Sequence, residues 1–170
     1  MSRSPMLHMV RLLCVCAALV VQVIRGCPNG WETFDGSCYF VSDLLEDWPT
    51  ASTTCGLYHA HLAEIEDTNE ENFLKQIVSK YHDGHSHDYD YWLGATDVFV
   101  EGDWRWMNSD QRLTYTDWYP DEPNDSNRLG EDCMVVHISQ HQYHWDDRRC
   151  TEKHNFICEI GGGSGAIVIG

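Results

Sequence analysis

Cysteines constrain this chain more than any other feature of its sequence. Of its eight cysteines, Cys14 and Cys16 lie in an apolar N-terminal run, and six follow between residues 27 and 158. An even number of cysteines in a secreted chain favours a disulfide framework, although the sequence alone leaves the pairing open. A zinc site would require two close CxxC pairs, which the sequence lacks. We therefore expect a disulfide-bonded extracellular domain.

The N-terminal segment has the composition of a secretory signal peptide. Arg3 and Arg11 precede an apolar run over residues 12–24. This run is shorter than the roughly 20 apolar residues that span a bilayer. We therefore expect a signal peptide over residues 1–26, a folded domain over residues 27–160 and a Gly-rich flexible tail over residues 161–170. The mature protein is then secreted and extracellular, without insertion into a membrane.

The net charge argues against one class of partner. The chain has 27 Asp and Glu against 11 Lys and Arg, a formal net charge of -16. Proteins that bind nucleic acid neutralise its phosphates with clustered Lys and Arg, so no nucleic-acid partner is expected. The excess of carboxylates favours cations as partners instead.

Helix signals are confined to the first half of the mature chain. A short helix is predicted over residues 48–58, with Asp47 near its start and Pro49 in its first turn. Thr68 and Glu71 predict a capping box for a second helix, in which apolar residues recur at helical spacing up to Tyr81. His82, His85 and His87 follow in a polar stretch without zinc-type spacing, so a loop is expected there.

Strand signals surround the two helices. Residues 27–41 suggest a hairpin, and short aromatic or β-branched runs separated by turn residues occur beyond residue 90. These runs cover residues 91–93, 104–107, 113–118, 134–138 and 155–160. Because strands do not alternate with helices, the predicted class is α+β.

Acidic residues gather in and after a long loop that follows Trp118. The segments 121–125, 131–132 and 146–147 together contain seven carboxylates and the amide of Asn124. Ca²⁺ prefers hard oxygen ligands of this kind and tolerates irregular geometry. The simpler interpretation is a set of solvated surface acids, but cysteines flank the cluster and fix its ends. The sequence therefore predicts a calcium site.

Four motifs in order resemble those of the C-type lectin-like domain. They are Trp92-Leu93-Gly94, Glu122-Pro123-Asn124, Gly130-Glu131-Asp132-Cys133 and Phe156-Ile157-Cys158-Glu159. The chain looks most similar to the small secreted lectins of invertebrates, including the perlucin-like group. The resemblance implies two helices flanking short antiparallel sheets, a long calcium-binding loop and three disulfides. The implied pairs are Cys27 with Cys38, Cys55 with Cys158, and Cys133 with Cys150.

The same resemblance implies two calcium sites. The ligands of the calcium that bears the sugar would be Glu122, Asn124, Glu131, Asp146 and Asp147, and the first four of these would also contact the sugar. A second calcium would be held by Asp97, Glu101, Asp125 and Asp132. The order Glu-Pro-Asn, with a cis bond before Pro123, is similar to that of lectins for mannose, glucose, fucose and N-acetylglucosamine.

The predicted function is therefore calcium-dependent carbohydrate binding, with glycans or glycoproteins as partners, including sugars on microbial surfaces. Innate immunity is one biological role that fits this function, and feeding and matrix assembly stay open beside it. An oligomer is compatible with the sequence. Two alternatives stay open: a calcium-stabilised domain that binds proteins, and an acidic matrix or mineral-associated protein. An enzyme is not expected, because the sequence contains no GxSxG, HExxH or phosphate-loop motif.

One residue departs from the family pattern. The family usually has Asn where this chain has Asp146, within Trp145-Asp146-Asp147. A carboxylate keeps a calcium ligand but lacks the N–H donor that a sugar hydroxyl needs, which costs about 1 to 3 kcal/mol, or roughly 5- to 150-fold in affinity. We expect weak monosaccharide binding, strengthened by Asp146→Asn, unless water or a bordering histidine supplies the donor. The bordering histidines are His137, His141 and His144.

Overall fold

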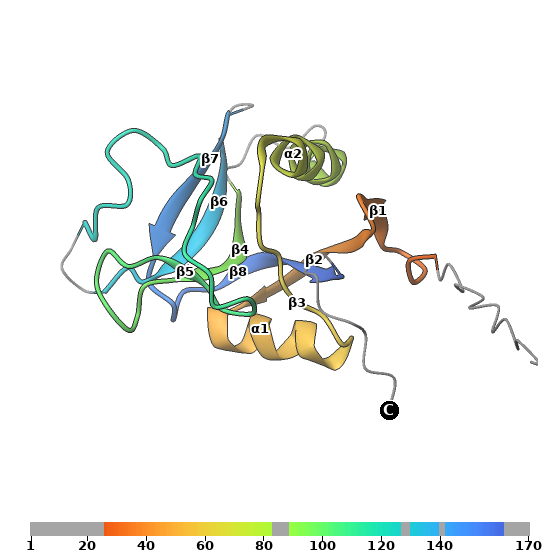
Figure 1. Ribbon diagram of the computed structural model, residues 1–170, viewed down its shortest axis with the longest axis horizontal. Coiled ribbons are helices and arrows are strands. Elements are labelled where there is room, and N and C mark those ends of the chain that lie inside the picture. The colour runs from red at the N-terminus through yellow and green to blue at the C-terminus, as the bar shows by residue number, and fades with distance from the viewer. Residues whose placement is uncertain (1–25, 83–88, 127–129, 140–141, 162–170) are drawn as a thin grey trace, which may run out of the picture.

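The computed structural model describes residues 26–82, 89–126, 130–139 and 142–161. These residues form two helices and a sheet (Figure 1). In chain order the elements are β1 (Glu32–Phe34), β2 (Ser37–Glu46), α1 (Trp48–Leu57), β3 (His61–Leu62), α2 (Thr68–His82), β4 (Tyr89–Thr96), β5 (Arg105–Trp106), β6 (Cys133–Ser139), β7 (Gln142–Arg148) and β8 (His154–Ile160).

The strands form one mixed sheet rather than the separate antiparallel sheets that were expected. Six strands lie in the order β1-β2-β8-β4-β6-β7, while β3 pairs with β8 and β5 pairs with β4. All pairs are antiparallel except β4 with β8, where Tyr91 lies opposite Asn155 and Trp92 opposite Phe156. This parallel pair joins two halves of the sheet. One half consists of β1, β2 and β8 and contains both ends of the domain, and the other consists of β4, β6 and β7. The α+β class is confirmed.

The two helices cover opposite faces of this sheet (Figure 1). Side chains alternate along a strand, so neighbouring residues of β4 face different cores. Tyr91 and Leu93 pack in the larger core with α2, and Trp92 packs in the smaller core with α1. Gly94 brings β4 close to β3, since a Cβ there would lie 2.7 Å from the Leu62 carbonyl oxygen.

The predicted cap of the first helix is confirmed, and that of the second is wrong by one residue. The Asp47 carboxylate accepts a hydrogen bond from Thr50 N at 3.0 Å and caps α1. The second cap is Asp67, whose Oδ1 accepts from Asn69 N at 2.7 Å and from Glu70 N at 3.0 Å. Sequence could not separate the two, because residues 67 and 70 fit the capping pattern as well as residues 68 and 71 do.

The strand predictions are correct for the first hairpin, β1 with β2, and for β4, β5, β6 and β8, but fail on either side of the acidic loop. Residues 113–118 form no strand, and Trp118 makes a single bridge to Trp145. Conversely, β7 was not predicted as a strand, because its alternating pattern places His, Asp and Arg on one face. Both differences place Trp118 and Trp145 side by side at the base of the loop.

The three disulfides have the pairing that the resemblance implied. Cys27–Cys38 closes the first hairpin, Cys55–Cys158 links α1 to β8, and Cys133–Cys150 closes the region that contains β6 and β7. Within the described ranges, no helix has both the length and the apolar character needed to cross a membrane.

Candidate functional site

The acidic loop is anchored to β7 at its start. Trp145 N donates to Asp117 O at 2.9 Å, and Tyr119 N donates to Trp145 O at the same distance. Trp145 is fully buried, and its indole packs edge-on against Trp118. The next residues of β7, Asp146 and Asp147, therefore lie directly beside the loop.

Asp147 fixes the Glu122-Pro123-Asn124 segment. Its carboxylate accepts hydrogen bonds from Asn124 N at 3.2 Å and from Asp125 N at 2.9 Å. The Glu122–Pro123 bond is cis, as the resemblance implied. The Asn124 amide donates to the Glu122 carboxylate, so these two side chains point toward each other.

Three of the predicted calcium ligands meet at this point. Carboxylate oxygens of Glu122, Asp146 and Asp147 lie within 4.8 Å of one another. Burial, followed by the hydrogen bond to Asp147 and the charge of Asp146, raises the pKa of Glu122 to about 7. Three converging carboxylates beside an amide oxygen fit the donor set of a hard cation such as Ca²⁺. A cation that bound here would displace a proton from Glu122 near neutral pH.

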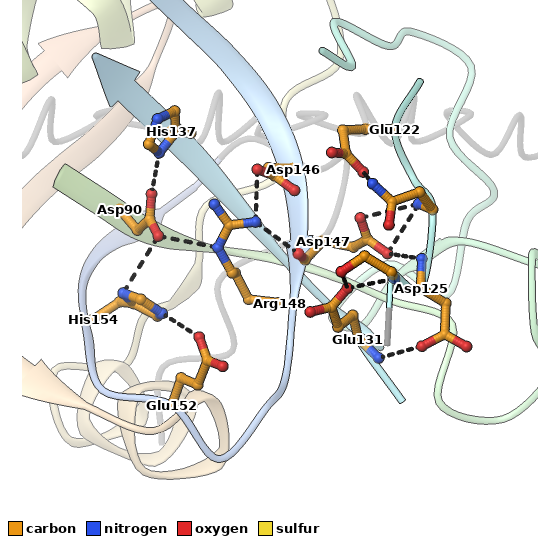
Figure 2. Close-up of polar contacts among 12 residues, drawn as sticks. Asp90, Glu122, Asp125, Glu131, His137, Asp146, Asp147, Arg148, Glu152 and His154 are labelled. Carbon is orange, nitrogen blue, oxygen red and sulfur yellow. Dashed lines mark hydrogen bonds and ion pairs between the residues drawn. The ribbon is translucent and has the colours of Figure 1, made fainter. Parts of the chain in front are cut away.

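Glu131 lies outside this group of three. Its Oε2 accepts hydrogen bonds from Ser126 N at 2.7 Å and Ser126 Oγ at 2.8 Å. Asp125 Oδ1 accepts from Gly130 N and Glu131 N, each at 3.1 Å. These bonds connect both sides of the loop and hold Glu131 near the cluster, as Figure 2 shows. A role for Glu131 in metal binding stays a prediction.

The residues predicted for the second calcium are more dispersed. Among the described residues, the only group of three or more metal-type side chains whose ligand atoms all lie within 4.8 Å of one another is Glu122, Asp146 and Asp147. Asp97 is 3% exposed, its Oδ2 accepts from Gly102 N at 2.8 Å, and its Oδ1 is buried without a hydrogen-bond partner in the described structure. Burial, with the nearby charges of Glu101 and Asp132, raises the pKa of Asp97 to about 6. The orphaned oxygen fits a cation ligand, and the second site stays a prediction.

Sequence reasoning missed one cation at the site. Arg148 Nη1 lies 2.6 Å from Asp146 Oδ2, and Arg148 Nε lies 3.2 Å from Asp90 Oδ2. The sequence feature that could have identified this arginine is the alternating pattern of β7, which places residues 146 and 148 on the same face of the strand. Asp90 also holds His137, whose Nδ1 lies 2.6 Å from Asp90 Oδ1 (Figure 2).

Of the other two histidines that were expected to border the sugar, only His144 lies among the described residues, and it is not a member of the carboxylate group. His144 Nδ1 lies 3.8 Å from Asp117 Oδ1, at the start of the loop. His141 lies outside the described residues, as do His85, His87 and the side chain of His82. The predicted signal peptide and Gly-rich tail also fall outside them, except for Gly26 and Gly161.

Two buried acids, Glu71 in α2 and Glu159 in β8, predict a pH dependence of stability. Burial raises the pKa of Glu71, which accepts from Trp145 Nε1, and the pKa of Glu159, in each case to about 8. The unfolded chain releases these protons near pH ~4.3, so between that pH and about 8 only the folded chain holds them. The free energy of unfolding of the metal-free protein should therefore fall as pH rises from 6 to 8, by on the order of 1 kcal/mol per pH unit for each group.

Urea unfolding of calcium-free protein at pH 6 and pH 8 measures this effect. Glu159→Gln should make the pH dependence shallower, because the amide cannot ionise. Higher stability at pH 8 than at pH 6 would contradict the assignment of Glu71 and Glu159 as protonated buried acids.

Sequence comparison decides the family. The sequence model of the Lectin C-type domain matches residues 45–160. The chain belongs to this family. The match includes every residue of the acidic loop and both helices, so the family and fold that the motifs predicted are confirmed.

Three similar proteins show the range of this C-type lectin domain. The perlucin-like protein of Mytilus galloprovincialis is 34% identical over 133 residues, which cover 78% of this chain and 81% of that protein. The cow CD23 carbohydrate-recognition domain, solved in the presence of a GlcNAc2Man3 oligosaccharide, has a TM-score of 0.67 and 29% identity and covers 81% of this chain and 98% of its own. The Ca²⁺-free form of a Ca²⁺-dependent type II antifreeze protein has a TM-score of 0.69 and 30% identity, with coverages of 79% and 100%. Because proteins with this fold differ in function, the ligand must be argued from the site of this chain.

Proposed function

We propose that this C-type lectin domain is secreted and binds carbohydrate in a calcium-dependent manner, with preference for the mannose, glucose, fucose and N-acetylglucosamine class. One observation supports this most strongly: the carboxylates of Glu122, Asp146 and Asp147 converge within 4.8 Å. The first of them opens a Glu-Pro-Asn segment with a cis bond, and Asp147 holds that segment through two backbone N–H groups.

Each side chain has a distinct role in this proposal. A bound Ca²⁺ supplies coordination positions that two neighbouring sugar hydroxyls can fill. Glu122, Asp146 and Asp147 hold the ion, and Glu122 accepts a hydrogen bond from one hydroxyl. The Asn124 amide, which donates to Glu122 in this structure, donates to a hydroxyl in the complex. Glu131 joins the site by turning away from Ser126.

The antifreeze neighbour supports a second candidate function, which is calcium-dependent binding of a ligand other than sugar. A protein-binding or matrix role belongs to the same group. In this candidate function a cation still binds at the three carboxylates. The hydrogen bonds that the Glu-Pro-Asn segment would make to sugar hydroxyls are not required. The two functions therefore differ in sugar retention and agree in calcium dependence.

Chromatography and melting measured together test the proposal. The full secreted protein should be retained on mannose-agarose in Ca²⁺, elute with EDTA, and be retained less on galactose-agarose. Calcium should also raise the melting temperature, since a ligand at a hundred times its dissociation constant stabilises the fold by about 2.7 kcal/mol. Calcium-dependent melting without retention on either sugar would contradict sugar binding and support the second candidate. Identical melting curves with calcium and with EDTA would contradict both.

A further inference from the structure

The extra carboxylate in the site is paired with an arginine. Asp146 stands where the family resemblance leads us to expect Asn, so the site gains a negative charge and loses an N–H donor. Arg148 lies on the same face of β7, with Nη1 2.6 Å from Asp146 Oδ2. The Asp146–Arg148 pair has no net charge, like the single amide that it replaces.

Arg148 is fixed from its other side. Its Nε lies 3.2 Å from Asp90 Oδ2, and its Nη1 also donates to Asp147 O at 3.0 Å. Asp90 is held in turn by His137 at 2.6 Å and by His154, whose Nδ1 is 3.6 Å away (Figure 2). The guanidinium group is therefore positioned by residues of β4, β6 and β8 beside the β7 carboxylates.

One nitrogen of the guanidinium group has no partner among the described residues. Nε and Nη1 are engaged, whereas Nη2 has no hydrogen-bond partner within the described part of the chain. The side chain is 24% exposed. Arginine cannot lose its proton at physiological pH, so these N–H groups remain donors.

We propose that Arg148 is a sugar-binding residue that supplies the hydrogen-bond donor absent from Asp146 and neutralises its charge. This inference rests on the proposed function of the site. It commits to a neutral hydroxyl as the acceptor, because the two carboxylates of Asp90 and Asp146 together exceed the single guanidinium charge and leave little attraction for an acidic sugar. Asp146→Asn alone is then no longer expected to strengthen mannose binding. The N–H group of the new amide would face Arg148 Nη1, which is also a donor.

Arg148→Met tests the proposal, because methionine keeps an unbranched stem but has neither charge nor donor. Mannose affinity at saturating calcium should fall about 5- to 150-fold, the effect of one missing hydrogen bond to a polar ligand. Calcium affinity without sugar should stay the same or rise, since Asp146 is no longer neutralised. Calorimetric titrations of calcium and of mannose measure the two affinities separately.

A double variant and a neighbouring arginine complete the experiment. Arg148→Met combined with Asp146→Asn should restore mannose affinity to within a few-fold of the wild type. The new amide can then donate to the sugar hydroxyl, because no arginine N–H group faces it. Arg149→Gln is the matched control, because Arg149 is 46% exposed and pairs with Glu152; both affinities should be unchanged.

Two results would overturn the inference while leaving the proposed function intact: unchanged mannose affinity in Arg148→Met, or an equal loss of calcium and mannose affinity that the double variant fails to restore. Wild-type protein that binds calcium but no mannose would overturn the proposed function, and this inference with it.

Discussion

Asparagine in place of Asp147 is expected to abolish retention on mannose-agarose and to weaken calcium binding by roughly 10- to 150-fold, the range for losing one charged hydrogen bond. Asp147 is 2% exposed, and its carboxylate accepts from both Asn124 N and Asp125 N. An amide of the same shape keeps one oxygen for these backbone N–H groups and places its NH2 group near Asn124 N, where Asp147 has its second oxygen. The loop would be held less firmly, and the cluster of three carboxylates would lose a member.

Calorimetric titration with calcium measures this loss. Asp43→Asn is the control, because Asp43 is exposed in β2 and belongs to no candidate site. Its calcium affinity and its retention on mannose should match those of the wild type. Because asparagine is isosteric with aspartate, Asp147→Asn should still fold, and a cooperative melt of the metal-free variant would verify this. Calcium affinity within twofold of the wild type would remove Asp147 from the site and, with it, the main support for the proposed function.

Local signals were sufficient for the parts of the fold that depend on neighbouring residues. Asp47 with Pro49 identified the start of α1, and the spacing of apolar residues identified α2. The second cap was misplaced by one residue because residues 67–71 contain two overlapping patterns, and burial decides between them. Glu71 is fully buried and accepts from Trp145, so it was unavailable for capping.

Long-range pairing explains what the sequence did not show. The carboxylates of Asp146 and Asp147 were predicted because they lie next to a recognisable tryptophan. Arg148 was not, because its partner Asp90 is 58 residues away and meets it only because β4, β6 and β7 lie next to one another in the sheet. The single mixed sheet was missed for the same reason, since the parallel pairing of β4 with β8 leaves no local pattern.

Removal of the Cys55–Cys158 disulfide should cost more stability than removal of Cys27–Cys38. The first bridge joins cysteines 103 residues apart and the second joins cysteines 11 apart. A cross-link lowers the entropy of the unfolded chain more when the loop is longer, by about 4.7 kcal/mol for a loop of ~100 residues and about 3 kcal/mol for ~15 residues. Folded domains of this size are stable by only about 5 to 15 kcal/mol, so losing the long bridge should unfold a large fraction of the protein near body temperature.

Burial adds to the difference between the two bridges. Cys55 and Cys158 are fully buried in the smaller core beside Trp92, so paired alanine substitutions also remove packing between α1 and β8. Urea unfolding of the Cys55→Ala/Cys158→Ala and Cys27→Ala/Cys38→Ala variants gives the two costs. The two bridges join elements other than β7 and the acidic loop. The calcium affinity of the folded fraction should therefore stay at the wild-type value, and saturating calcium should recover part of the lost stability. An equal or larger cost for Cys27–Cys38 would show that loop length and burial do not determine the stabilisation in this domain.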